Sequence, residues 1–448
     1  MMTQRHNKII LLSLLALSAC APYSANTAGI RNSLSSGDHT GALAAIEKAA
    51  HGPSKLLYFL ESGLVAHYDG QYVRSNNLLD RAERIADELF TRSLSRELAS
   101  LITSDESRHY RGEPYELVFI HYYRALNYWY LHLPEDALVE CRKANLKLAR
   151  YESDDDRQRA YRNDAFIHYL TALFYESERE YNDAYVSLKD AEIAYAVYGE
   201  IFDLEAPESL ISDLARVESE LGYAGAVPSL AHLAPRSRSG ELVVFTELGF
   251  VPRKTQEEVN LPIYESDLKR VRSGKARRTS RQIRQRHYHR RHKNVDYWLR
   301  VALPQLEPVQ NHRERILISS GGYQTVPEKA QDLDRIARRT LEDNEGSIFV
   351  RTVARGLIKL AATKGAEKKS EWFGFLVNLF TAATEKADTR SWVTLPREIR
   401  IGRLILPPGE HTITIQSRDS YGIIIEAKER TVTIEAGKRT FINQRLYG

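Results

Sequence analysis

The feature that most constrains the fold is a spacing of small residues that occurs three times in the first half of the chain. In each copy a second small residue follows the first after twelve positions, an apolar residue after sixteen and another small residue after nineteen. The three sets are Gly63, Ser75, Leu79 and Ala82; Ala125, Ala137, Cys141 and Ala144; and Ala172, Ala184, Leu188 and Ala191. Two antiparallel helices that cross closely need small side chains at fixed positions, which is the tetratricopeptide pattern.

The spacing predicts a helical-repeat domain over residues 30–222. Consecutive copies are 62 and 47 residues apart, measured from Ser75 to Ala137 and from Ala137 to Ala184. A regular array would give about 34 residues, so the repeats are degenerate and contain insertions. A non-repetitive helical bundle is the alternative that the same pattern leaves open.

In a repeat stack of this kind, the first helix of each pair lines a concave surface. Five aromatic residues fall at these positions: Tyr68, Tyr122, Trp129, Tyr130 and Tyr169. Aromatic side chains give a large contact area at low entropy cost, so they predict a groove that binds a peptide or helix of another protein. The same rings could instead fill the space between helices, as buried aromatic residues commonly do.

The pattern changes after residues 223–240, where Pro228, Pro235 and several serines are typical of a linker. Residues 241–448 contain short runs of strand-forming residues separated by turns, with the last strands expected to be antiparallel. Helices are expected within 327–387, over 327–342, 347–364 and 369–387. We therefore predict a multidomain chain: an N-terminal all-α, tetratricopeptide-like repeat domain and then a β-rich, sandwich-like α+β domain with inserted helices.

The first 19 residues have the form of an export signal. Arg5 and Lys8 precede an apolar run over residues 9–17, which is shorter than the ~20 residues needed to span a bilayer. Ser18 and Ala19 before Cys20 form the pattern that the lipoprotein signal peptidase cleaves. We expect Cys20 to carry the lipid, palmitate included, and residues 20–29 to be a short tether. Ala21 favours the outer membrane, with the protein on its periplasmic face.

A second unusual segment runs from Lys269 to Lys293. It contains twelve Lys or Arg residues and no Asp or Glu, whereas the rest of the chain has 51 basic and 59 acidic residues. We expect a solvated basic loop at 269–293, and a nucleic-acid partner is not expected in this compartment. The loop is also the candidate site for an anionic envelope polymer, peptidoglycan or lipopolysaccharide. The arginines concerned are Arg277, Arg278, Arg281, Arg284, Arg290 and Arg291.

The sequence contains no nucleophile elbow, phosphate-binding glycine loop or paired cysteines for a metal, so we expect no enzyme activity, no cofactor and no metal site. A cell-wall-acting enzyme remains the remote alternative, with Glu113, Glu116, Glu385 and Asp388 as its candidate carboxylates. A structural role is expected instead, in which an Asp388–Arg390 pair and Trp392 fix an inserted helix to the sheet.

Several blocks of the chain resemble a family of uncharacterised proteobacterial lipoproteins with tetratricopeptide-like repeats. The blocks are Gly112–Glu116, Tyr123–Tyr128, Glu135–Asn145, Gly240–Phe245, Val301–Pro304 and Ala387–Trp392. The family has no agreed activity, and the resemblance implies an outer-membrane lipoprotein that takes part in envelope assembly. We therefore expect a scaffold that binds another envelope protein through the groove. Neither the partner nor the oligomeric state follows from the sequence.

Overall fold

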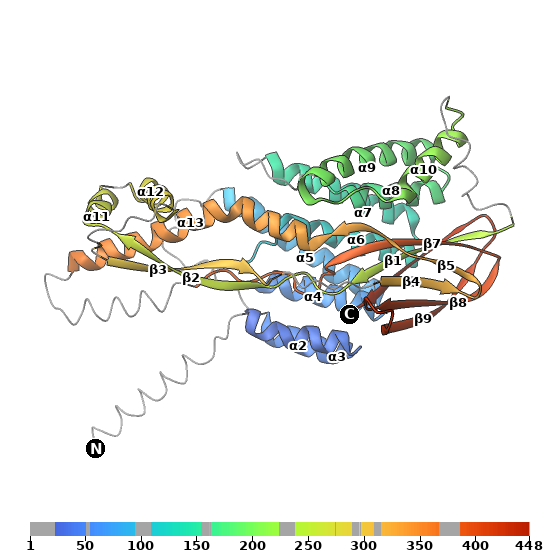
Figure 1. Ribbon diagram of the computed structural model, residues 1–448, viewed down its shortest axis with the longest axis horizontal. Coiled ribbons are helices and arrows are strands. Elements are labelled where there is room, and N and C mark those ends of the chain that lie inside the picture. The colour runs from blue at the N-terminus through green and yellow to red at the C-terminus, as the bar shows by residue number, and fades with distance from the viewer. Residues whose placement is uncertain are drawn as a thin grey trace, which may run out of the picture.

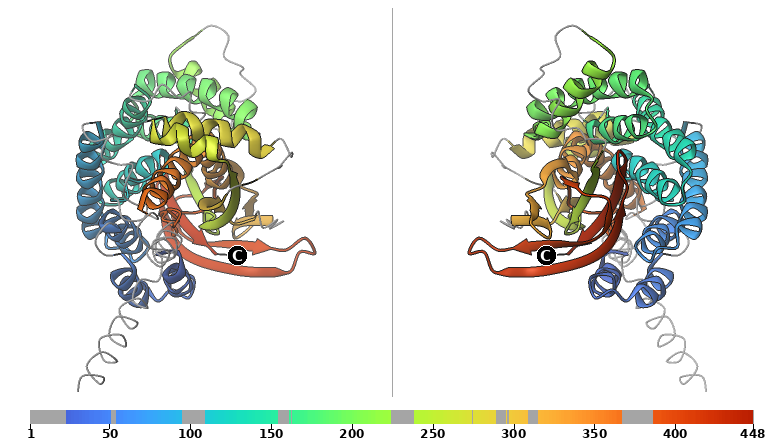
Figure 2. Two further views of the ribbon diagram at one scale, coloured as in Figure 1. Left: turned by 90° about the vertical axis from the view of Figure 1, so that its left-hand side faces the viewer. Right: turned by 90° about the vertical axis from the view of Figure 1, so that its right-hand side faces the viewer.

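The computed structural model describes residues 23–50, 54–94, 109–153, 161, 163–223, 238–273, 275–288, 295, 297–308, 315–366 and 386–447. An arc of helices partly surrounds a core of β-sheets, as the end-on views show (Figure 2). A second, smaller group of helices and two strands extends to one end of the molecule (Figure 1). The predicted fold class, a helical-repeat region followed by a β-rich region with helices, is confirmed.

Antiparallel helix pairs build the arc. They are α2 (Tyr23–Ser35), α3 (His39–Ala49), α4 (Lys55–Tyr68), α5 (Tyr72–Leu94), α6 (Pro114–Tyr130), α7 (Pro134–Ser153), α8 (Ala165–Ser177), α9 (Tyr181–Phe202) and α10 (Glu208–Glu220). Among the residues described, no helix combines the length and apolarity needed to cross a membrane.

The small residues act as the spacing predicts. Gly63 on α4 faces α5 so closely that a Cβ atom at this position would lie 2.6 Å from Cδ2 of Leu79. The Ser75 hydroxyl donates a hydrogen bond of 2.7 Å to the carbonyl oxygen of Gly63. Ala125 of α6 and Ala137 of α7 stand at the equivalent positions, and both are fully buried.

The start of the chain differs from the predicted tether. Helix α2 begins at Tyr23, so most of residues 20–29 belong to the folded domain. The Tyr23 side chain is buried, and its hydroxyl donates a 2.8 Å hydrogen bond to Glu61 on α4. Only Ala21 and Pro22 separate Cys20 from this helix, and Cys20 itself lies outside the described residues.

The β-rich region contains two four-stranded sheets that face each other. One has the order β10-β1-β7-β6 and the other β5-β4-β8-β9. The strands are β1 (Gly240–Leu248), β4 (Arg315–Ser320), β5 (Tyr323–Thr325), β6 (Glu328–Asp332), β7 (Glu398–Leu406), β8 (Gly409–Arg418), β9 (Ile424–Ile434) and β10 (Arg439–Leu446). Apolar residues such as Val244, Ile318 and Ile415 fill the space between them, which is the predicted sandwich.

One strand pairing was not anticipated. The predicted antiparallel C-terminal strand, β10, pairs in parallel with β1. No hairpin turn joins these two strands, because almost the whole domain lies between them in sequence, so nothing forces them to be antiparallel.

The smaller end group consists of β2 (Lys254–Ile263), α11 (Glu265–Arg272), α12 (Ala276–Tyr288), β3 (Tyr297–Leu306) and α13 (Leu333–Ala366). The prediction of a basic loop was therefore wrong for its described part, which is helical. Ile283 of α12 packs with Val353 of α13 and Leu299 of β3 in a small apolar core.

The predicted helix boundaries in this region were also partly wrong. Residues 328–332 form the edge strand β6, and one continuous helix, α13, replaces the two expected at 327–342 and 347–364. Helix α13 passes through Gly346 without a break. The Arg284 guanidinium packs against this glycine, where a Cβ atom would come within 2.3 Å of its Nη1. Most of the helix expected at 369–387 lies outside the described residues.

Residues 386–397 form a segment without helix or strand, here called the strap, that turns at residues 393–395 and runs between the helical arc and the sheet. The backbone N–H of Trp392 donates to Glu116 of α6 over 2.7 Å, and that of Val393 donates to Glu61 over 2.9 Å. Burial raises the pKa of Glu61 from its usual 4.5 to about 7, although its hydrogen bonds with Thr394, Tyr23 and Val393 lower it. Both carboxyl groups are fully buried and fix the strap to the helices.

Replacing Glu61 with Gln tests this arrangement. The pKa of Glu61 is higher in the folded chain than in the unfolded chain, where it is 4.5. The protonated carboxyl therefore makes its full contribution to stability below pH 4.5. That contribution is lost as pH rises through about 7. The free energy of unfolding of the native chain should therefore fall between pH 5 and pH 8 relative to Glu61→Gln, by on the order of 3 kcal/mol. Urea unfolding of both proteins at each pH measures the difference, and a gap independent of pH would contradict the prediction.

Candidate functional site

The inner face of the helical arc packs against the chain's own sheet. Tyr122 of α6 is fully buried, and its hydroxyl donates a 2.9 Å hydrogen bond to Oε1 of Glu247 on β1. The Tyr68 hydroxyl of α4 donates to the other carboxylate oxygen of Glu247. Glu247 is itself fully buried, so it needs the hydrogen-bond donors that the helices and Asn443 of β10 supply.

Aromatic packing continues this contact along β10. Trp129 stacks on Phe174 of α8, with ring centres 4.2 Å apart, and meets Phe441 of β10 edge-on at 5.1 Å. The Tyr130 hydroxyl donates to the side chain of Asn443 over 2.8 Å and accepts its backbone N–H over 2.9 Å.

Charged groups complete the contact near Tyr169. Its hydroxyl donates to Asp213 of α10 over 2.8 Å and accepts a 2.7 Å hydrogen bond from Arg403 of β7. Burial alone would raise the pKa of Asp213, but the guanidinium groups of Arg403 and Arg216 outweigh it and hold that pKa well below its usual value. Glu241 on β1 also pairs with Arg403, at 3.1 Å.

The predicted open groove is therefore absent from this structure. Its five aromatic residues, Tyr68, Tyr122, Trp129, Tyr130 and Tyr169, do lie on the first helices of their pairs, but β1, β7 and β10 cover them. The surface that repeat proteins offer to a partner is an internal interface here. The rings fill the space between the first helices and the sheet, and Trp129 also stacks between helices, as the alternative expected.

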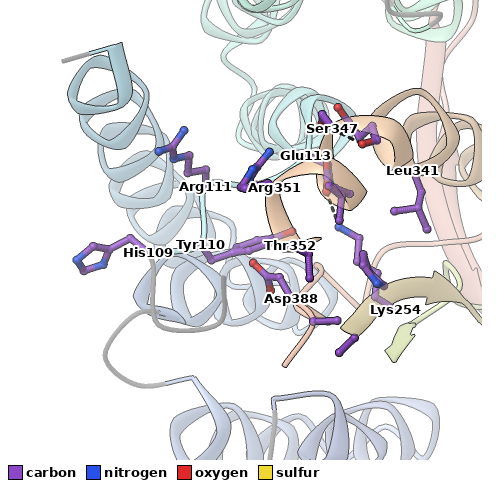
Figure 3. Close-up of a pocket in the computed structure, with 16 residues that line it drawn as sticks. His109, Tyr110, Arg111, Glu113, Lys254, Leu341, Ser347, Arg351, Thr352 and Asp388 are labelled. Carbon is purple, nitrogen blue, oxygen red and sulfur yellow. Dashed lines mark hydrogen bonds and ion pairs between the residues drawn. The ribbon is translucent and has the colours of Figure 1, made fainter. Parts of the chain in front are cut away.

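A cleft lies where the helical arc, the smaller end group and the strap meet. Its cavity has a volume of about 240 Å³ (Figure 3). Two of the most recognisable sequence blocks contribute to it, through Gly112 and Glu113 before α6 and through Ala387 and Asp388 of the strap. The other lining residues are His109, Tyr110, Arg111, Lys254, Ala302, Pro304, Leu341, Asn344, Ser347, Ile348, Arg351 and Thr352.

Local structure fixes the loop that forms one wall of this cleft. Gly112 has a φ of +79°, which favours glycine, and a Cβ there would also come within 2.7 Å of Leu117. Glu113 caps α6 and Pro114 follows at its first position, so the helix start is rigid. Glu113 can therefore hold the ammonium group of Lys254, which is only 7% exposed. The Glu113 carboxylate raises the pKa of Lys254 against the effect of burial.

The carboxylates proposed from the sequence have different positions. Asp388 forms the expected pair with Arg390, with Oδ2 and Nη2 2.7 Å apart. Trp392 packs near Tyr123 of α6, with ring centres 6.2 Å apart, so it contacts the helical arc. The inserted helix that it was expected to fix, at 369–387, lies mostly outside the described residues. Glu116 is fully buried and accepts one hydrogen bond from the strap, from the backbone N–H of Trp392. Glu385 lies outside the described residues.

Sequence reasoning missed three cationic residues of the cleft, Arg111, Lys254 and Arg351. Arg111 directly precedes the block Gly112–Glu116 that carries the family resemblance, so its position in the sequence could have indicated it. Lys254 starts β2 and Arg351 lies in the middle of α13, so only the tertiary fold brings them to the cleft.

The basic segment presents its arginines on a helical surface. Arg277, Arg278 and Arg281 are exposed on α12, whereas Arg284 is half-buried and lies 4.0 Å from Glu345 of α13. Arg290 and Arg291 lie outside the described residues. The arginines of α12 are thus carried by a helix that packs on a small apolar core. A solvated loop would have no such core beneath it.

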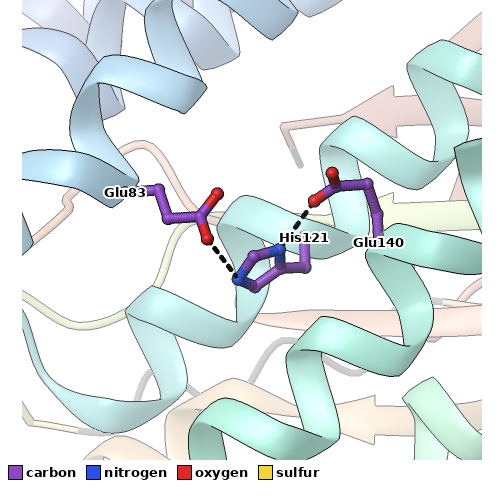
Figure 4. A group of neighbouring side chains, drawn as sticks. All are labelled: Glu83, His121 and Glu140. Atoms are coloured by element: carbon purple, nitrogen blue, oxygen red, sulfur yellow. Dashed lines mark hydrogen bonds and ion pairs between the residues drawn. The ribbon is translucent and has the colours of Figure 1, made fainter. Parts of the chain in front are cut away.

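One buried group has the residue types of a metal site. Glu83, His121 and Glu140 come from α5, α6 and α7, and their ligand atoms lie within 4.8 Å of one another (Figure 4). Glu140 also pairs with Arg124 at 3.1 Å, and Glu83 pairs with Lys147 at 3.2 Å. These cations already compensate the carboxylates and would repel a metal ion, so the group is an ion-pair network that joins three helices.

Comparison with known proteins gives no family. No family model and no curated protein matches the chain. Solved structures that match part of it include the MamA protein, with 11% identity over 45% of this chain and 82% of that one, and a TM-score of 0.27. The apo form of RapI has 15% identity over 48% and 53%, with a TM-score of 0.33.

A third solved structure, aspartyl phosphate phosphatase F from Bacillus subtilis, has 19% identity over 42% of this chain and 40% of that one, with a TM-score of 0.26. The chain thus spans about half the length of RapI and less of the phosphatase. At these scores the likenesses carry no argument about activity or partners.

Substitution of Tyr122 distinguishes a core residue from a groove residue. Tyr122→Ala should lower the free energy of unfolding by about 3–5 kcal/mol, since it removes a fully buried ring. Tyr122→Phe should cost about 1–3 kcal/mol, because only the donor to Glu247 is lost. Urea unfolding measures both values, and an Ala variant as stable as the native chain would show that the ring is not part of the core.

Proposed function

We propose that this chain is a lipid-anchored scaffold of the cell envelope, held at the periplasmic face of the outer membrane through Cys20, that binds another envelope protein. Because the sheet covers the inner face of the helices, the partner binds elsewhere. The proposal rests on the apolar residues that the outer helices expose.

These exposed residues repeat with the helical pairs. Val139 and Leu146 of α7 stand two and nine positions after Ala137, and Val186 and Ile193 of α9 stand at the same positions after Ala184. Leu146 is 70% exposed and Ile193 is 62% exposed. Single exposed apolar residues are ordinary on a protein surface. Here, however, apolar residues are exposed at the same two positions of α7 and of α9, the second helices of consecutive pairs, and such a repeated surface suits a protein partner.

The β-rich region offers a second exposed apolar surface, at the turn between β8 and β9. Tyr421 is 89% exposed, and Ile423, Ile424 and Ile425 are also exposed. The Asp419 side chain fixes this turn by accepting the backbone N–H groups of Tyr421 and Ile423, both at 2.9 Å. An ordered turn with outward-facing apolar side chains supports a second contact with the partner.

The outer-helix surface is tested by Leu146→Ser together with Ile193→Ser. Both side chains are exposed, so stability should change by less than about 1 kcal/mol. Crosslinking in cells followed by mass spectrometry should recover one recurrent envelope protein with the native chain and lose it with the double variant. Val73→Ser on α5, which is 60% exposed, is the matched control and should retain the partner. Equal recovery with all three proteins would contradict this site.

The anchor is tested separately by Cys20→Ser. The substitution removes the thiol group to which the lipid is expected to be attached. The protein should then move from the outer-membrane fraction to the soluble periplasmic fraction, and labelling with radioactive palmitate should disappear. Unchanged fractionation and labelling would overturn the anchor without affecting the outer-helix surface.

A second candidate function, binding of an anionic envelope polymer, is favoured by the exposed arginines of α12. Such binding should weaken as salt is raised, because charge attraction between exposed groups is screened beyond a Debye length of about 8 Å at physiological salt. Retention of the protein on purified sacculi or lipopolysaccharide measures it. Replacement of Arg277, Arg278 and Arg281 by Gln should abolish the retention, and retention unchanged by salt or by these substitutions would exclude this function.

A further inference from the structure

The cleft beside α6 has the features of a small binding site. Three separate parts of the fold form its walls: the loop before α6, the strap, and α13 with the neighbouring strands β2 and β3. Its volume of about 240 Å³ is just below the roughly 300–1,000 Å³ typical of sites for drug-sized ligands. The cavity therefore suits a small molecule or one end of a longer one.

Both acidic residues of the cleft are already compensated. Glu113 is paired with Lys254, and Asp388 receives two hydrogen bonds from Arg390, at 2.8 Å from Nε and 2.7 Å from Nη2. Arg390 in turn is buried and lies over the Tyr110 ring, 5.5 Å from its centre. The two carboxylates are therefore held by the protein and leave no unbalanced negative charge for a cationic ligand.

The cleft also contains a guanidinium group on α13. Arg351 of α13 lines the cleft beside the loop before α6, which carries Arg111 (Figure 3). Arg351 is half-buried and forms no ion pair within the described part of the chain. Thr352 and Ser347, on the same helix, add hydroxyl groups to the lining. A guanidinium group binds planar or tetrahedral oxyanions with two parallel hydrogen bonds.

We propose that this cleft binds the anionic group, a carboxylate or a phosphate, of a small ligand or of the end of a longer one. Arg351 supplies the opposite charge, and the hydroxyl group of Thr352 orients the ligand. The site is independent of the outer-helix surface and of the α12 arginines, so it stands even where the scaffold proposal fails.

Calorimetric titration of the full mature chain tests the proposal with three probes. N-acetyl-alanyl-alanine carries a carboxylate, its C-terminal amide is the matched neutral compound, and inorganic phosphate is the third. Saturable binding of the acid, about tenfold or more tighter than that of the amide, would identify a carboxylate ligand. Binding of phosphate alone would identify a phosphate ligand. Failure of both anions to bind, or equal binding of acid and amide, would overturn the proposal.

Variants of α13 show whether binding occurs in this cleft. Arg351→Gln should weaken the binding of the anion about tenfold or more. Arg351→Lys should weaken the binding less, because the positive charge remains although the two parallel donors are lost. Arg339→Gln is the control on the same helix, since Arg339 is exposed and pairs with Asp343 at 3.1 Å. Native affinity in Arg351→Gln, with an unchanged unfolding midpoint, would place the binding elsewhere and overturn the proposal.

Discussion

The rest of the structure depends on the buried contact between the inner helices and the sheet. Glu247 and Arg403 bring charged groups from the sheet into this contact, where an unpaired charge is very costly. The hydroxyl groups of Tyr68 and Tyr122 donate to Glu247, and Arg403 pairs with Asp213 of α10. Neither side can leave the other without exposing aromatic surface and abandoning these hydrogen bonds. The helical arc and the sheet are therefore one structural unit, and the arc does not act as an independent adaptor.

This contact also explains where the candidate sites are found. Since the sheet fills the concave side, the exposed features lie outside it: the apolar residues of α7 and α9, the turn between β8 and β9, and the arginines of α12. The strap, held by Glu61 and Glu116, passes from the core to the cleft and carries Asp388 there. The cleft is thus formed only when the loop before α6, the strap, α13 and strands β2 and β3 are all in place.

Much of the architecture follows from local pattern. The spacing of Gly63, Ser75 and their equivalents predicts the helix pairs, because close crossing leaves room for nothing larger. Alternating apolar residues predict most strands of the sandwich. The sequence could not show what covers the inner face, since Tyr122 has the same position in a helix whether a partner or the chain's own sheet lies against it. Helix α12 was missed because the described residues bury only one large apolar side chain there, Ile283, amid a run of arginines.

The candidate cleft was less predictable than the fold. Gly112, Glu113 and Asp388 stood in recognisable blocks, but Lys254 and Arg351 come from elements far away in sequence, and only tertiary packing brings them together.

Hydrogen exchange of the native protein tests most directly whether the helices and the sheet are one unit. The slowest backbone amides of α6 and of β1 should exchange with the same free energy of opening, because neither element can open while the other stays intact. If β1 and β10 instead opened at a much lower free energy than α6, the sheet would be a detachable cover. The aromatic face would then be open to a partner, contrary to this account.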